Sequence, residues 1–77
     1  MFISIMFKDK YGVFKGKEYD YKLCSNEQQP IVGSIVRLMD KNYDFIHYGT
    51  RVLVTAVKSF SNTAKVEVRC LETTLDD

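Results

Sequence analysis

The chain alternates between apolar and polar residues over several short segments, the pattern that predicts half-buried β-strands. In the segment Phe2–Phe7 the face that carries Ile3 and Ile5 is wholly apolar, so we expect it to point into the core. The segment Glu18–Leu23 alternates between charged and apolar residues throughout, which predicts a second strand.

The middle of the chain holds a turn followed by a strand, Pro30–Leu38. Pro30 fixes its own φ angle and Gly33 tolerates positive φ angles, which favours a turn before the β-branched residues that follow. We expect this segment to pair with neighbours on both sides. Further strands are predicted at Ser34–Met39, Thr50–Lys58 and Ala64–Leu71, with a brief strand or ordered loop at Phe45–Tyr48.

No segment shows helical periodicity over two turns, and turn residues separate the predicted strands. Gly16 stands between two lysines, so a turn is predicted at Lys15–Lys17. Many short strands in a chain of this length predict an all-β fold with no substantial helix. We expect a small, strongly bent barrel of five or six strands, SH3-like or OB-like. A single domain is predicted over residues 1–71, with a frayed tail at 72–77.

Composition agrees with a small globular domain. The chain has 77 residues, of which 45% are hydrophobic, a share too high for a disordered protein. A domain of this size has a free energy of unfolding on the order of 5 kcal/mol. The formal net charge is only +1, which argues against nucleic acid as the main partner, because proteins that bind phosphate backbones carry a clear basic excess.

Cys24 and Cys70 are the only cysteines, and we expect both to be free thiols in a reducing compartment. The apolar segment Met1–Phe7 is too short for a signal peptide and has no basic start. These features predict a cytoplasmic protein that makes no use of a membrane.

Catalytic groups are few. His47 is the one histidine, and it could act as a base only if the fold brought a cysteine to it. The spacing of His47, Cys24 and Cys70 matches no metal site, and the glycines form no phosphate-binding loop. We therefore expect a protein without enzymatic activity, cofactor or metal.

Two groups of residues are candidates for binding. The first combines arginines with aromatic residues, which are favoured at the centres of protein–protein interfaces. If the strands that carry the arginines are neighbours, these side chains form one patch. The candidate protein-binding residues are Tyr43, Phe45, Tyr48, Arg51 and Arg37.

The second group lies in residues 7–22, where aromatic residues interleave with lysines. Proteins that bind single-stranded nucleic acids use this mixture, because rings stack on bases while ammonium groups meet phosphates. The segment Lys10–Phe14 resembles the ring-rich strand of cold-shock proteins, although the nearby acids Asp9, Glu18 and Asp20 reduce the positive potential. The alternative nucleic-acid-binding residues are Lys10, Tyr11, Lys15, Lys17, Tyr19 and Tyr21.

Four stretches carry a family resemblance: Phe7–Asp9, Lys15–Lys22, Val32–Val36 and Arg51–Val57. In these the chain resembles small uncharacterised β-barrel proteins encoded by phages and prophages of Gram-positive bacteria. The resemblance implies a phage-type origin, a small barrel and a location in the host cytoplasm. The chain departs from that pattern at Asp40–Tyr48, where an aromatic-rich loop replaces a shorter turn and offers a place for binding specificity.

These observations favour a non-catalytic, phage-type binding protein that engages a protein partner and inhibits or redirects a host defence or replication factor. The alternative is a barrel that binds single-stranded nucleic acid through residues 7–22. A homo-oligomer formed through an exposed strand edge at Phe2–Phe7 is a further expectation.

Overall fold

The computed structural model describes residues 1–25, 29–64 and 66–72. In these ranges the protein is all-β, apart from one 3₁₀ turn, η1. The elements in chain order are β1 (Phe2–Lys8), β2 (Phe14–Leu23), β3 (Ile35–Met39), η1 (His47–Gly49), β4 (Arg51–Lys58) and β5 (Glu67–Glu72). The predicted fold class is confirmed.

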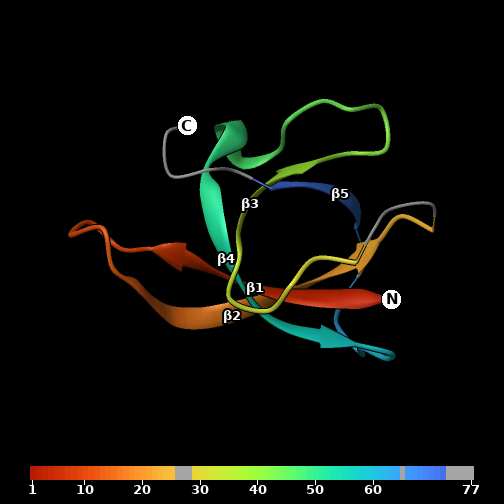
Figure 1. Cartoon of the computed structure of the whole chain (residues 1–77), viewed down its shortest axis with the longest axis horizontal. Coiled ribbons are helices and arrows are strands. Elements are labelled where there is room, and N and C mark those ends of the chain that lie inside the picture. The colour runs from red at the N-terminus through yellow and green to blue at the C-terminus, as the bar shows by residue number, and fades with distance from the viewer. Residues whose placement is uncertain (26–28, 65, 73–77) are drawn as a thin grey trace.

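The five strands of the described chain close into a barrel in the order β1-β2-β5-β3-β4. Four of the strand pairs are antiparallel, and only β2 and β5 run parallel. In Figure 1, β3 and β5 lie together at one end of the molecule and β1 and β2 at the other, while β4 runs from η1 past β1. The barrel is therefore no simple up-and-down meander, because β5 is inserted between β2 and β3.

The core is formed by aliphatic side chains from four strands. Ile3 and Ile5 have no exposed surface, which confirms the predicted inward face of the first strand. The buried cluster consists of Ile3, Ile5, Val36, Leu38, Val52, Val54 and Val68. Phe7 and Tyr21 pack against it from one end. A period of two along each strand thus places one wholly aliphatic layer inside the barrel.

The second strand is longer than predicted, and the turn expected at Lys15–Lys17 is wrong. β2 begins at Phe14 and passes through this segment without reversing. Met6 faces Glu18 across the ladder and Lys8 faces Phe14, so β2 carries extra residues opposite β1. Gly16 lies within this irregular stretch and adopts a φ of +97°, a conformation that glycine takes without steric cost and that some bulges use.

The turn and strand in the middle of the chain behave as predicted. Gly33 adopts a φ of +93°, and the Ser34 amide donates a 3.0 Å hydrogen bond to the Ile31 carbonyl. β3 then pairs with β4 on one side and with β5 on the other. The segment Phe45–Tyr48 is an ordered loop, joined to β3 by a single bridge between Phe45 and Met39.

The expected strand edge at Phe2–Phe7 is wrong. β1 pairs with β2 and with β4, so barrel closure leaves neither side of it open. At the other end of the chain, the backbone of Glu72 still belongs to β5, one residue beyond the predicted boundary. The predicted frayed tail otherwise falls on 73–77, outside the described residues.

The substitution Ile5→Ala tests the core. Ile5 is wholly buried, so the lost contacts and the resulting cavity should lower the free energy of unfolding by about 3 kcal/mol. The matched control is Ile31→Ala, because Ile31 is 72% exposed and should change stability by less than about 0.5 kcal/mol. Urea titrations followed by circular dichroism measure both, and equal losses would contradict this description of the core.

Candidate functional site

The loop between β3 and β4 is built around the Asp40 carboxylate. Its Oδ1 accepts hydrogen bonds from the amides of Asn42 and Asp44, at 2.8 and 3.1 Å. The Asp40 amide in turn donates to the Asp44 carbonyl at 2.8 Å. This self-contained turn holds Tyr43 in the left-handed region, at a φ of 66°, with 64% of its surface exposed.

The same loop ends in a strained turn. His47 and Tyr48 have φ angles of 53° and 57°, and each left-handed residue other than glycine costs roughly 1 kcal/mol. Two hydrogen bonds to the His47 carbonyl hold this geometry, from the Thr50 hydroxyl at 2.6 Å and the Thr50 amide at 3.0 Å. The strain leaves the Tyr48 ring fully exposed, and outliers of this kind gather at functional sites.

Arginines from the barrel wall lie against the rings of this loop. The Arg37 guanidinium carbon is 5.0 Å from the centre of the Phe45 ring. The corresponding distance from Arg69 to Tyr43 is 4.3 Å. Arg37 and Arg51 face each other across β3 and β4, which confirms that their strands are neighbours.

We call these side chains the rim patch: Tyr43, Phe45, Tyr48, Arg37, Arg51 and Arg69. The five residues predicted for protein binding lie on β3, β4 and the loop between them, and the structure brings Arg37 to Phe45 and Arg51, whereas Tyr48 projects into solvent. Arg69 was not predicted. The alternation of β5 marks it as facing away from Val68, but only the pairing of β5 with β3 places it beside Tyr43.

The alternative nucleic-acid residues lie at the turn between β1 and β2 and along β2. On the β1–β2 hairpin, the Lys10 ammonium lies 5.2 Å from the Tyr11 ring centre, and the Lys17 ammonium lies 5.5 Å from that of Tyr19. Lys15 is instead paired with the Asp9 carboxylate at 3.5 Å.

Tyr21 lies further along β2, in the same pocket as Lys17 and Tyr19, and its ring reaches the edge of the core and His47. Its hydroxyl is 2.7 Å from Nε2 of His47, and burial raises the pKa of this hydroxyl. The Phe7 ring packs edge-on against both His47 and Tyr19, with ring centres 5.0 and 5.5 Å apart. His47 is itself exposed, and it thus contacts a tyrosine and a phenylalanine at the surface of the molecule.

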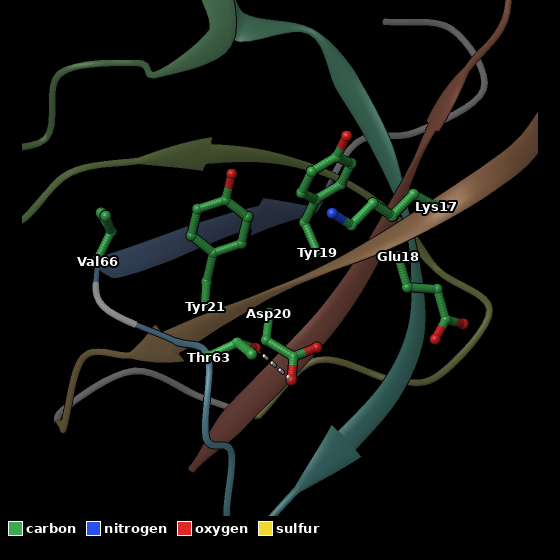
Figure 2. A pocket seen from close by; sticks show the side chains of 7 residues that line it. All are labelled: Lys17, Glu18, Tyr19, Asp20, Tyr21, Thr63 and Val66. Carbon is green, nitrogen blue, oxygen red and sulfur yellow. Dashed lines mark hydrogen bonds between the residues drawn. The ribbon is translucent and has the colours of Figure 1, made fainter.

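A pocket of about 310 Å³ follows the outer side of β2. Its lining residues are Lys17, Glu18, Tyr19, Asp20, Tyr21, Thr63 and Val66. Figure 2 shows the rings of Tyr19 and Tyr21 on one side of the strand, and the carboxylates of Glu18 and Asp20 on the other. Both positive and negative side chains line this pocket, so it has no electrostatic preference for an anionic or a cationic ligand.

Asp20 has a structural role in that pocket. Its carboxylate accepts hydrogen bonds from the hydroxyls of Ser4 and Ser61, at 2.6 and 2.7 Å, and an ion pair from Lys58 at 3.2 Å. Ser4 is wholly buried, so Asp20 satisfies the one buried hydroxyl of β1. The Ser4 and Ser61 hydroxyls and Lys58 hold the pKa of this carboxyl at about 2, against the opposing effect of desolvation.

The thiols and carboxylates show no assembled reactive centre in the part of the chain that the structure describes. Cys24 is buried and Cys70 half-buried, and both carry thiols rather than disulfides, as predicted. No group of three potential metal ligands occurs among the described residues. The described ranges also contain no helix with the length and apolarity that a membrane crossing requires.

Comparison with protein-family models, with curated proteins and with solved structures gave no match. The resemblance to phage-encoded barrel proteins therefore stays a prediction, and the argument for function rests on the site itself.

The pH dependence of stability tests the Asp20 network. The pKa of Asp20 is lowered from 3.8 to about 2 on folding, so the network stabilises the fold above pH 4 and loses this effect as the pH falls through 2. We expect a loss of about 2 kcal/mol in the free energy of unfolding between pH 5 and pH 2 from this group. Asp20→Asn should remove that part of the loss, while Asp44→Asn, at an exposed carboxylate, should retain it. Identical pH profiles for the wild type and Asp20→Asn would contradict the assignment.

Proposed function

We propose that this protein is a non-catalytic binding barrel whose rim patch contacts a protein partner. The observation that carries the proposal is the pairing of exposed rings with arginines on one loop and the strands beside it. Tyr48 is fully exposed, and Phe45 is 46% exposed although Arg37 lies against it. Rings exposed in this way add nothing to the stability of the fold, so their exposure favours a role in binding.

Preorganisation supports a binding role for this loop. Side chains lose conformational entropy when they bind, and this loss weakens the affinity. A ring that a guanidinium already restrains loses less of this entropy on binding. The left-handed geometry at Tyr43 and Tyr48 is maintained by the Asp40 carboxylate and by the Thr50 hydrogen bonds. The loop therefore presents its rings in a fixed arrangement before any partner arrives.

Charge defines the kind of surface that would fit. Arg37 and Arg51 lie side by side on the strands beside the loop, and the Asp40 carboxylate is occupied within its own turn. A partner with an acidic surface would complement them. Under the resemblance to phage-encoded barrels, that partner is a host defence or replication factor.

A triple substitution in the rim patch tests the proposal. Tyr43→Asn and Tyr48→Asn keep a residue that tolerates positive φ, and Phe45→Ser removes the third ring. We expect the affinity for a captured partner to fall at least about 30-fold, because aromatic hot spots contribute 2 kcal/mol or more each. Capture on immobilised protein identifies the partner, and surface plasmon resonance measures the loss.

The matched control removes three exposed apolar side chains elsewhere, with Tyr11→Asn, Ile31→Ser and Phe60→Ser. A partner that binds the wild type and this control, but not the rim variant, supports the proposal. Capture that is lost in the control and kept in the rim variant would place the interface elsewhere.

A second function has its own observation in the β1–β2 hairpin. Lys10 and Lys17 each lie over a neighbouring tyrosine ring, and Tyr11 is 76% exposed. This arrangement of ammonium and ring suits single-stranded nucleic acid. Lys15 contributes less to it, because Asp9 already neutralises its charge.

The variant Lys10→Glu/Lys17→Glu tests this second function. If the hairpin binds phosphates, fluorescence anisotropy with a labelled single-stranded oligonucleotide should show wild-type binding that weakens steeply with salt, and at least a tenfold loss in the variant. Lys41→Glu, on the loop between β3 and β4, is the control for a lysine outside the hairpin. Equal affinity of the wild type and the double variant would exclude the hairpin as the binding surface.

A further inference from the structure

A groove of about 370 Å³ opens beside the rim patch, where β1, β3 and β4 meet η1. We call it the basic groove. It is lined by Lys8, Arg37, Gly49, Thr50 and Arg51. Three of these five residues are cations and none is acidic. The groove therefore concentrates positive charge in a protein whose net charge is only +1.

In the part of the chain that the structure describes, some lysines are paired with carboxylates, but the three cations of the basic groove are not. Lys15, Lys22 and Lys58 each lie within 4.0 Å of a carboxylate. Among the described residues, no carboxylate forms an ion pair with Lys8, Arg37 or Arg51. The Lys8 ammonium instead lies 5.2 Å from the Phe14 ring centre.

The arrangement of the two arginines is unfavourable without a counter-charge. Arg37 and Arg51 are directly opposite across an antiparallel ladder, where like charges destabilise the pair. The Nε atom of Arg37 is buried and has no hydrogen-bond partner among the described residues. The repulsion between these two neighbouring guanidinium groups, rather than the buried Nε atom, points to a bound anion in the open groove.

We propose that the basic groove binds an oxyanion of the phosphate class. Guanidinium groups present parallel N–H donors that match phosphate oxygens, and three cations suit a dianion better than a single carboxylate. Phe45 lies against Arg37 and so restrains the guanidinium. The groove has room for a phosphate and for a substituent on it, such as the ring of a phosphate monoester.

The site goes beyond the proposed protein contact, because it concerns a small anion and can be tested on the protein alone. Thermal unfolding is measured with sodium phosphate, phenyl phosphate, sodium acetate and sodium chloride at equal ionic strength. We expect phosphate to raise Tm by roughly 5–10 °C at ten times its dissociation constant, where the ratio of folded to unfolded protein gains about elevenfold. Phenyl phosphate should do the same, and acetate and chloride should not.

The two phosphate probes distinguish the sources of the anion. Equal dissociation constants for phosphate and phenyl phosphate identify a site for the free ion, and tighter binding of phenyl phosphate identifies a site for a monoester. Either result supports the proposal. A rise in Tm that acetate or chloride produces equally would overturn it, because the effect would then be general screening of charge.

Substitutions show which cations are responsible for the phosphate-dependent rise in Tm. Arg37→Gln/Arg51→Gln removes two charges from the basic groove, and Lys15→Gln/Lys17→Gln removes two from the hairpin. We expect the phosphate-dependent rise in Tm to disappear in the first variant and to remain in the second. The opposite result would overturn the assignment of the site.

A measurement on the wild type keeps the test independent of how the arginine variant folds. In a phosphate titration followed by ¹H–¹⁵N NMR spectra, the amide signals of Lys8, Arg37, Gly49, Thr50 and Arg51 should shift with one saturating curve. Shifts confined to the hairpin residues, or linear shifts without saturation, would overturn the proposal.

Discussion

The closure of the barrel by β5 is the constraint on which the other features depend. β5 lies between β2 and β3, but it meets β2 through only two residue pairs, Lys22 with Glu67 and Leu23 with Val68. Two backbone hydrogen bonds of 3.0 and 2.9 Å reinforce the contact, from the amides of Lys22 and Cys24. β5 is therefore held mainly by its antiparallel ladder with β3 and by Val68, which is wholly buried in the core. The pairing with β3 also brings Arg69 to the rim patch, beside Tyr43.

The rigid barrel also explains how the chain sustains an unfavourable loop. Three residues between β3 and β4 that are not glycine adopt left-handed angles, and Arg37 faces Arg51 just below them. An isolated loop would relax from such a geometry. Here both ends are fixed by β3 and β4, whose inward side chains are among the most buried in the molecule. The stabilisation from the aliphatic core thus exceeds the cost of the left-handed loop residues and of the two neighbouring arginines.

Local sequence pattern located the strands, though not where β2 and β5 begin, and it identified the inward face of β1, because the period of two is a property of each strand alone. It placed Ile3 and Ile5 inside the barrel before any partner strand was known. It failed at Gly16, since positive φ is shared by turns and bulges, and only the register against β1 distinguishes them. Contacts between distant strands could not be predicted either. The Ser4–Asp20 hydrogen bond and the position of Arg69 beside Tyr43 follow from pairings that no local pattern encodes.

Arg37 belongs both to the rim patch and to the basic groove. Its guanidinium lies against the Phe45 ring, while the same side chain lines the groove beside Arg51. The ring in turn lies about 3.6 Å from the place where Gly49 would carry a Cβ atom, so it stands close to the wall of the basic groove as well as to the guanidinium. An anion that fixes Arg37 would therefore reduce the motion of Phe45, and a partner that covers Phe45 would favour the same orientation of Arg37. Linkage requires the anion and the partner to change each other's affinity by the same factor. Because an acidic partner would also draw on the charges of Arg37 and Arg51, that factor is set by the balance between the ordering of Phe45 and the sharing of these two charges.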